Sequence, residues 1–313
     1  MTHTSSPQTP STPPNSVWSF SLLNTDCGGQ AVQLNSLLPD IVEGRSYPFT
    51  VCYYLAELLT VTGMLQGLFK SKGILTLQLK SDAIIHTLVC EINHEGHMRA
   101  YGYFNEEALS AALTLEKTQE ETQPALLPFE QAFGEGYLLL TVHAEGGDRY
   151  QGIVALQPGG VQASFEHYFE QSLQVPTFIR MAVAPPEQTS GWRSRGILVQ
   201  QTASFSGGPL GCKAEDWHTL SVLCDTLKKE ELLSETLSLN DVLYRLFHEF
   251  GVSVYPAAVV QAKCHCSLQR TASLVEQVVQ EETSGESLPQ EVEITCEYCG
   301  KTYTIHNTSA PSH

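Results

Sequence analysis

Cys264-His265-Cys266 is followed, after 29 further residues, by Cys296-Glu297-Tyr298-Cys299. Two closely spaced thiol pairs separated by a polar segment are typical of a site in which four thiolates hold one zinc ion. Structural zinc is bound by four soft donor atoms in a tetrahedral arrangement. Two such thiol pairs provide these four donors when they come together in the fold. The sequence therefore predicts a structural zinc site with one ion and the ligands Cys264, Cys266, Cys296 and Cys299.

Two other interpretations of these residues have to be compared with the zinc site. A C-x-x-C motif on its own also occurs in thioredoxin-like redox sites, and His265 is a possible ligand in place of a thiolate. Both motifs together favour zinc, and four thiolates already complete its tetrahedron without a histidine. Residues 292–295 and 302–305 are expected to form a short hairpin around the second pair.

The composition is that of an acidic globular protein. The chain has 313 residues, of which 42% are hydrophobic, and this is enough for one large or two smaller domains. Its formal net charge of −17 argues against nucleic acid and anionic membranes as partners, because both need a basic surface. The cysteines outside the two motifs stand singly in apolar runs and are expected to be small buried residues in a reducing compartment: Cys27, Cys52, Cys90, Cys212 and Cys224.

Two N-terminal stretches differ sharply in their polarity. Residues 1–16 are rich in Ser, Thr and Pro, so a disordered tail is predicted; they lack the features of a signal peptide, which favours a cytoplasmic location. The most apolar stretch, residues 51–69, contains Glu57 and Gln66 and is too polar to span a bilayer. Its apolar side chains recur at helical spacing, which predicts a helix in the core.

The middle of the chain shows strand patterns separated by turns and one amphipathic helix. Alternation of apolar and polar residues indicates strands, and runs of antiparallel strands with interposed helices indicate an α+β fold with an antiparallel-sheet core. The glycine pairs, Gly28-Gly29 among them, lack the spacing of a phosphate-binding loop and are expected to be turns. The predicted strands are residues 75–80, 84–92, 97–104, 137–144, 149–156, 177–184 and 192–201, and the helix is residues 161–174.

A linker-like segment, residues 204–211, precedes a helical region. One helical pattern begins near Asp216, and another follows the capping-box sequence Ser238-Leu239-Asn240-Asp241. Helices this short are unstable alone, so we expect them to pack on the core sheet. The predicted organisation is a disordered tail (1–16), an α+β core domain (17–205), a helical linker region (206–255) and a C-terminal zinc module (256–313).

From about residue 44 to residue 303 the chain resembles the heat-shock protein 33 family of redox-regulated chaperones. The family's C-x-C and C-x-x-C zinc signature is matched, although Ser81-Asp82-Ala83-Ile84 departs from the family's usual turn. The other stretches that carry the resemblance are Gly73-Ile74-Leu75-Thr76-Leu77-Gln78-Leu79-Lys80, Tyr150-Gln151-Gly152-Ile153-Val154, Tyr168-Phe169-Glu170-Gln171-Ser172, Gly196-Ile197-Leu198-Val199-Gln200 and Tyr244-Arg245-Leu246-Phe247-His248-Glu249.

This resemblance implies an ATP-independent holdase chaperone that is inactive when reduced and zinc-bound. Oxidants together with unfolding stress would form disulfides, release zinc and unfold the C-terminal module. The physics agrees, since the module has few large apolar side chains and needs the metal's binding free energy, about 10–16 kcal/mol in comparable peptides. We predict one disulfide between Cys264 and Cys266 and another between Cys296 and Cys299.

Loss of the module is expected to release the helices of residues 214–250 from the sheet beneath them. Large exposed apolar patches bind unfolded chains, so the expected partners are unfolded or partly folded proteins. The family further implies a homodimer when oxidised, and neither nucleic acid nor a membrane is expected as a partner. The predicted client-binding residues are Trp217, Leu220, Leu227, Leu243, Leu246, Phe247 and Phe250.

Two rival functional classes are less well supported. A zinc-ribbon nucleic-acid-binding protein is disfavoured because Arg270 is the only basic residue between Cys266 and Cys299, among seven glutamates. The second class is an enzyme, either a thiol oxidoreductase or a zinc hydrolase. A four-thiolate site leaves no coordination position for water, which disfavours the hydrolase, and an insulin-reduction assay would test the oxidoreductase. We therefore do not expect an enzyme.

Overall fold

The computed structural model describes residues 13–43, 45–67, 72–116, 125–186, 188, 191–202, 211–269, 272 and 291–306. Residues 1–12 of the predicted tail, residues 204–210 of the predicted linker segment and most of the stretch between the two cysteine pairs lie outside this part of the chain. Within it, no helix combines the length and the apolar character needed to cross a membrane.

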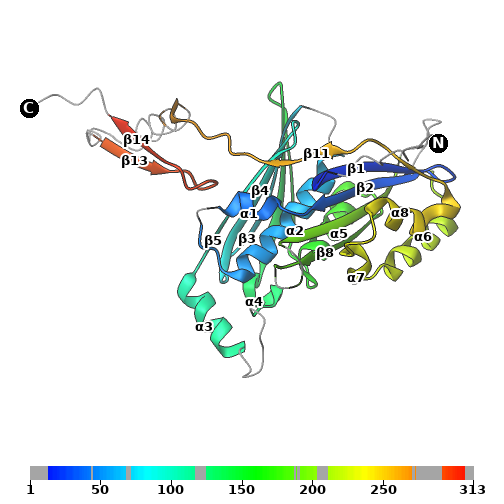
Figure 1. Ribbon diagram of the computed structural model, residues 1–313, viewed down its shortest axis with the longest axis horizontal. Coiled ribbons are helices and arrows are strands. Elements are labelled where there is room, and N and C mark those ends of the chain that lie inside the picture. The colour runs from blue at the N-terminus through cyan, green and yellow to red at the C-terminus, as the bar shows by residue number, and fades with distance from the viewer. Residues whose placement is uncertain are drawn as a thin grey trace, which may run out of the picture.

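Two sheets form the body of the protein (Figure 1). The first sheet has the strand order β10-β1-β2-β9-β8, with β11 also paired to β1. Its strands are β1 (Asn15–Leu22), β2 (Cys27–Leu34), β8 (Thr177–Ala184), β9 (Arg193–Gln201), β10 (Val252–Val254) and β11 (Ala258–Val259).

The second sheet has the strand order β12-β5-β4-β3-β6-β7, in which the β12–β5 pair is parallel and the others are antiparallel. Antiparallel sheets with helices between their strands confirm the predicted α+β class. The strands of this sheet are β3 (Gly73–Ser81), β4 (Ile85–Asn93), β5 (His97–Phe104), β6 (Gly136–Ala144), β7 (Arg149–Ala155) and β12 (Gln261–Ala262).

Helix α2 (Phe49–Gln66) lies between the two sheets, as the apolar pattern predicted. It contacts β2, β8 and β9 of the first sheet and β3, β4 and β5 of the second. Fourteen of its 18 residues are buried, as expected for a helix that is apolar all round. Two of its buried threonines bond within the helix: Thr60 Oγ1 donates to Ala56 O at 2.6 Å, and Thr62 Oγ1 donates to Leu58 O at 2.7 Å. The third, Thr50, bonds outside the helix, where its Oγ1 accepts from Leu127 N at 3.2 Å.

Three helices cover the opposite face of the first sheet and are called the linker helices below: α6 (Ala214–Thr226), α7 (Lys229–Leu232) and α8 (Leu239–Phe247). Strand geometry explains the two faces, because neighbouring side chains point to opposite sides. Leu198 belongs to the core around α2, whereas Ile197 and Val199 pack under the linker helices. The predicted capping box opens α8, where Asp241 N donates to Ser238 Oγ at 3.1 Å.

The remaining helices are shorter or lie at the periphery. The predicted helix of residues 161–174 is α5 continued by a π-helical turn. These helices are α1 (Leu37–Val42), α3 (Glu106–Glu116), α4 (Phe129–Phe133), α5 (Gly160–Tyr168), the π-helical η1 (Phe169–Leu173) and the 3-10 helix η2 (His248–Phe250).

The N-terminal hairpin of β1 and β2 differs from the sequence expectation in two respects. Strand β1 begins at Asn15, inside the predicted tail, because Asn15 pairs with Leu34 and its side-chain oxygen accepts from Asn35 N at 3.0 Å. The pair Gly28-Gly29 lies within β2 and is not a turn. A Cβ at Gly29 would lie 1.8 Å from Leu198 O of β9, so the close approach of these strands requires glycine.

Residues 252–262 form short edge strands on both core sheets, although the sequence analysis assigned them to the linker region and the zinc module. Strands β10 and β11 pair with β1 of the first sheet, and β12 pairs with β5 of the second. Val260, between them, is 1% exposed and belongs to the main core. This segment, called the edge segment below, connects the linker helices to the cysteines and ties both sheets together.

Candidate metal centre

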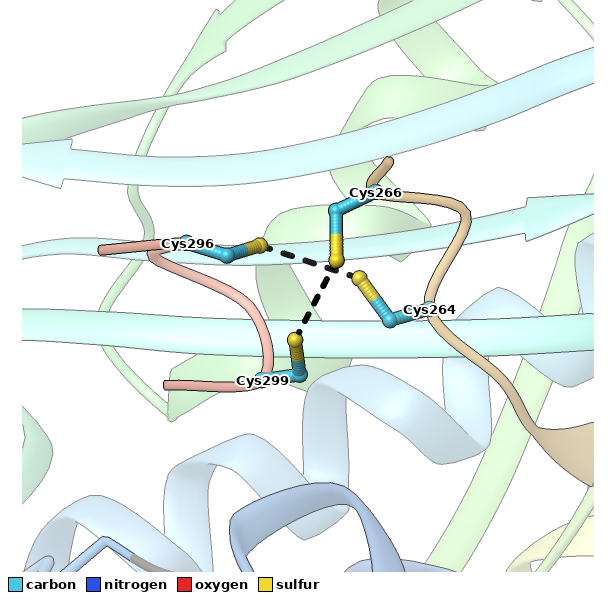
Figure 2. A group of neighbouring side chains, drawn as sticks. All are labelled: Cys264, Cys266, Cys296 and Cys299. Carbon is cyan, nitrogen blue, oxygen red and sulfur yellow. Dashed lines mark hydrogen bonds between the residues drawn. The ribbon is translucent and has the colours of Figure 1, made fainter. Parts of the chain in front are cut away.

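The four predicted ligands converge from two separate segments of the chain (Figure 2). Cys264 and Cys266 follow β12, while Cys296 and Cys299 lie in the turn between β13 (Glu291–Thr295) and β14 (Thr302–His306). These two strands form the predicted hairpin, and they pair with each other as a separate two-stranded sheet. The hairpin and the segment with Cys264 and Cys266 are called the cysteine module below.

The sulfur positions fit a tetrahedral metal ion. All four sulfurs lie within 4.8 Å of one another. The Sγ–Sγ distance is 3.7 Å between Cys264 and Cys296 and 3.4 Å between Cys266 and Cys299. A tetrahedron with metal–sulfur bonds of about 2.3 Å has edges of about 3.8 Å. The structure therefore brings together a donor set with the spacing and the softness that zinc prefers.

The backbone of the hairpin turn fixes the second thiol pair. Cys296 N donates to Lys301 O, and Gly300 N donates to Cys296 O, both at 2.9 Å. Gly300 has a φ of +70°, a left-handed conformation that glycine adopts without strain. Figure 2 shows the side chains of Cys296 and Cys299 pointing from this turn toward the sulfurs of Cys264 and Cys266.

The surroundings of Cys299 shift its pKa. Burial, followed by the neighbouring thiols, raises the pKa of Cys299 to about 12. A divalent cation reverses this trend, because it attracts thiolates and offsets their mutual repulsion. The Tyr303 hydroxyl lies 3.2 Å from Cys266 Sγ and can donate to it. His265 has other neighbours: its Nε2 lies 3.3 Å from Asn93 Nδ2, and its ring packs 5.3 Å from that of His97.

The cysteine module is docked on strands β4 and β5 of the second sheet. Tyr298, inside the C-x-x-C motif, donates from its hydroxyl to Glu91 Oε1 at 2.7 Å. The guanidinium of Arg99 lies 3.8 Å from the centre of the Tyr298 ring and pairs with Glu91 at 2.6 Å. Arg45 adds a hydrogen bond of 2.8 Å to Cys296 O. These partners are far from the cysteines in sequence, and no local motif could have identified them.

All seven predicted client-binding residues lie in one apolar cluster between the linker helices and the first sheet. Phe247 stacks on Phe20 of β1 with ring centroids 6.1 Å apart, and Trp217 stacks on Phe178 of β8 at 4.6 Å. The buried members of the predicted set are Leu220, Leu243 and Phe247, and the partly buried ones are Trp217, Leu227, Leu246 and Phe250.

Two arginines of β9 bond to the segment between α7 and α8 and thereby attach the linker helices to the sheet. They were not predicted from the sequence. Arg195 is 5% exposed, and its Nη1 donates to Ser234 O at 2.9 Å and to Leu237 O at 2.8 Å. Arg193 pairs with Glu235 at 3.0 Å. The signal that could have found them is the Arg193-Ser194-Arg195 sequence, since two arginines within a core strand need partners.

Four of the five cysteines outside the metal centre are buried, as predicted, and Cys212 is partly exposed. Burial raises the pKa of Cys52 to about 11, which keeps this thiol protonated at neutral pH.

The chain is similar to members of one known protein family. The Hsp33 protein family matches residues 15–306. A 33 kDa chaperonin of Salmonella typhi is 33% identical over 281 residues, which cover 89% of this chain and 87% of the relative. A 33 kDa chaperonin of Shewanella frigidimarina is 31% identical over 284 residues, or 90% and 89% of the two chains.

A solved structure shows the same fold. The crystal structure of a 33 kDa chaperonin, a heat-shock protein 33 homologue from Thermotoga maritima, matches with a TM-score of 0.71 at 16% identity and covers 94% of this chain and 95% of that one. The match over residues 15–306 confirms the resemblance that the sequence motifs carried, and the chain belongs to the Hsp33 family.

Proposed function

We propose that this protein is a redox-regulated, ATP-independent holdase chaperone that is inactive in its reduced, zinc-bound form. The observation that carries this proposal is the apolar face of the first sheet, with Phe20, Ile197 and Val199, which lies beneath the linker helices. These helices are joined through the edge segment to a thiol cluster that can hold a metal. The apolar sheet face is thus covered by helices that are connected to cysteines which an oxidant can attack.

The first step is the loss of the ligand set. When bound, zinc supplies the cysteine module with folding free energy by holding the four thiolates. Oxidation would join Cys264 to Cys266 and Cys296 to Cys299 and thereby remove the thiolates. None of the residues of β13 is buried, so the hairpin has little hydrophobic core to preserve its fold.

The second step carries the change across the molecule. Figure 1 shows the hairpin of β13 and β14 (red) and the linker helices (yellow) at opposite ends of the protein. The edge segment connects them, and its β12 is held by only two paired residues. Unfolding of the cysteine module removes the contacts of Tyr298 with Glu91 and Arg99 and frees the adjoining end of this segment.

The third step is the exposure of the client surface. Release of the linker helices uncovers their own apolar side chains together with the sheet face beneath, and such a patch binds unfolded or partly folded proteins. The net charge of −17 keeps the opened protein soluble. We include in the proposal a cytoplasmic location and a homodimeric oxidised form, with neither nucleic acid nor a membrane as a partner.

A single peroxide titration at raised temperature tests the proposal. Zinc release is followed with a chromophoric chelator, and suppression of the aggregation of a thermally unfolding protein is followed in parallel. We expect both signals to begin at the same peroxide dose and to be reversed by a thiol reductant. Zinc release without suppression of aggregation would contradict the proposal and would show that the metal has only a structural role.

Peptide mapping of the same oxidised samples tests the disulfide assignment. We expect Cys264 linked to Cys266 and Cys296 linked to Cys299. The short distances between Cys264 and Cys296 and between Cys266 and Cys299 make cross-linked motifs the competing outcome. Peptides joined across the two motifs would refute the assignment.

A further inference from the structure

Tyr298 of the cysteine module lies in a site formed by three side chains of the second sheet. Its hydroxyl donates to Glu91 Oε1 at 2.7 Å, and the Arg99 guanidinium lies 3.8 Å from the centre of its ring. The ring of Tyr101 packs against it at an angle of 85°, with ring centroids 4.9 Å apart. An acceptor for the hydroxyl, a cation over the ring and an aromatic neighbour together match a phenol side chain. Glu91, Arg99 and Tyr101 are called the tyrosine receptor below.

The tyrosine receptor is held in shape by the sheet. Glu91 of β4 and Arg99 of β5 are direct partners in the strand register. Arg99 Nε donates to Glu91 Oε2 at 2.7 Å, and Thr76 Oγ1 of β3 donates to Glu91 Oε1 at 3.4 Å. Tyr101 follows two residues after Arg99 and projects from the same face of β5, opposite to the buried Ala100 between them. Because these contacts do not involve the cysteine module, we expect the receptor to keep its geometry when the module leaves.

The occupant of the receptor, in contrast, is held by the cysteine module. Tyr298 stands between Cys296 and Cys299, and no residue of β13 in the adjoining strand is buried. Arg99 has a second contact with the module, since its Nη1 donates to Cys264 Sγ at 3.9 Å. Unfolding of the module withdraws both the phenol and this sulfur from the guanidinium. The emptied receptor can then bind another aromatic side chain.

We propose that the tyrosine receptor is a second client-binding site, which takes tyrosine side chains of unfolded proteins once the cysteine module has left it. In the reduced protein Tyr298 fills the site and excludes them. The opening of the site by oxidation rests on the function proposed above, whereas the receptor itself belongs to the folded sheet. It is separate from the apolar surface beneath the linker helices, because its residues lie in the second sheet and that surface lies on the first.

The chemistry of the receptor selects tyrosine among the side chains of an unfolded chain. The Glu91 carboxylate accepts a hydrogen bond that phenylalanine cannot donate, and bonds to a charged acceptor are the stronger ones. The ion pair of Arg99 with Glu91 at 2.6 Å leaves little net charge to attract an acidic side chain. Aliphatic and small polar side chains lack the ring over which the guanidinium lies. Unfolding exposes tyrosines that are packed in folded proteins, so an unfolded chain presents the matching ligand.

Two separate sites on one molecule bind a flexible chain more strongly than either site alone. The receptor lies beneath the cysteine module, at the end of the protein away from the linker helices (Figure 1). A client bound to the first sheet by an apolar segment can place a tyrosine of another segment in the receptor, and the linked contact raises the overall affinity. Reduction reverses this step: when the four thiols are restored and the module folds again, Tyr298 returns to the receptor and displaces the client's side chain.

A titration with blocked amino acids tests the receptor without any client. The amides of N-acetyl-tyrosine, N-acetyl-phenylalanine and N-acetyl-serine are added separately to the full-length Tyr298→Ser variant, in which the receptor is empty without oxidation, and the amide NMR shifts of residues 89–101 are followed. We expect the tyrosine probe to bind about tenfold more tightly than the phenylalanine probe, and the serine probe to cause no shift. Zinc-loaded wild type should not respond, because Tyr298 occupies the site. No shift with the tyrosine probe, or equal shifts in the variant and the zinc-loaded wild type, would overturn the proposal.

A matched pair of arginine substitutions tests which side chain binds the probe. In the Tyr298→Ser background Arg99→Met removes the cation over the ring, so we expect the affinity for the tyrosine probe to fall about tenfold. Arg149→Met is the control, because Arg149 is an exposed arginine of β7 in the same sheet and should leave the affinity unchanged. Unshifted amide signals of β3 and β6 verify the fold of both variants. Equal affinities would overturn the role of Arg99.

Complexes of the oxidised protein test the receptor as a client site. We expect a labelled, thermally unfolded protein to dissociate about threefold faster from oxidised Arg99→Met than from oxidised Arg149→Met, because one of two linked contacts is lost. Equal dissociation rates would refute the receptor as a client site. Binding of the tyrosine probe to Tyr298→Ser but not to oxidised wild type would instead refute the proposed opening of the module and leave the receptor standing.

Discussion

Helices α2 and α6 pack against opposite faces of the same sheet, but they are attached to it in different ways. Helix α2 has the second sheet on its other side and buries 14 of its 18 residues. Helix α6 buries only Leu220 and Cys224 among its 13 residues. The comparison teaches that one face of the first sheet belongs to the core between two sheets, whereas the other lies beneath helices such as α6, which buries few of its residues.

The sequences of the two helices account for this difference. Helix α2 is apolar around most of its circumference, and its Thr60 and Thr62 donate to their own helix backbone, so it packs between two sheets. Helix α6 carries Glu215 and Asp216 in its first turn and Asp225 near its end, which keep its outer face hydrated. A narrow apolar stripe is sufficient to hold a helix on a sheet and too small to make it part of a core.

Metal removal should give the largest difference between regions: the cysteine module should unfold while the core around α2 stays folded. Stripping the bound metal with a chelator removes about 10–16 kcal/mol of binding free energy from the cysteine module. We expect the NMR signals of β13 and β14 to collapse to random-coil positions while amide exchange in α2 stays unchanged. A hairpin that remains ordered without metal contradicts the proposed switch, and faster exchange in α2 contradicts the independence of the core.

Matched cavity mutations on the two faces should have different consequences. Leu58 of α2 and Leu243 of α8 are both completely buried, so replacement of either by alanine costs about 2–5 kcal/mol. We expect Leu58→Ala to lower the main urea-unfolding midpoint. Leu243→Ala should leave that midpoint nearly unchanged and give the reduced protein measurable holdase activity. Equal shifts of the main transition would show that both faces belong to one cooperative unit.

Replacement of the buried Arg195 of β9 should weaken the attachment of the linker helices without affecting α2. Arg195→Met removes charge-assisted hydrogen bonds to Ser234 O and Leu237 O, worth about 2–3 kcal/mol to the attachment of the linker helices. Hydrogen exchange of residues 229–247 should become faster while that of α2 does not. Arg193→Met is the control: its ionic partner Glu235 is 61% exposed, so an effect below about 1 kcal/mol is expected. Equal effects of the two variants would contradict this role of Arg195.

The smallest expected effect concerns Glu57 on α2, which should make the free energy of unfolding depend on pH. Burial raises its pKa to about 7, and the charge of Lys229 on α7 offsets this only in part. The folded state therefore binds this proton more tightly than the unfolded state, so the stabilisation is present at pH 4.5 and is lost as the pH rises through 7. With allowance for solvent screening we expect a loss of about 1–2 kcal/mol between pH 5 and pH 8. Urea unfolding at both pH values should show a flatter dependence for Glu57→Gln, and an equal slope would exclude this group.

Regular patterns in the sequence were sufficient to predict much of the fold and the thiol cluster. The run that forms α2 is long and apolar, strands such as β6 alternate with period two, and the spacing of the four cysteines is specific to a metal site. The hairpin of β1 and β2 was missed because Gly28-Gly29 has the composition of a turn, and only the approach of β9 shows why glycine is needed.

Features that depend on distant partners could not be predicted in this way. The edge strands β10, β11 and β12 have two or three residues each, too few for any periodicity to be detected. The contact of Tyr298 with Glu91 joins residues 207 positions apart in sequence.

The edge segment also determines how a mechanical pull would travel through the molecule. Tension that starts at the cysteines reaches β12 first, then β11 and β10, and the linker helices last. Strands loaded from one end peel, so their few backbone bonds break in succession instead of sharing the force. If the protein opens as proposed, we therefore expect the second sheet to lose β12 before the first sheet loses β11 and β10, so that opening proceeds in stages.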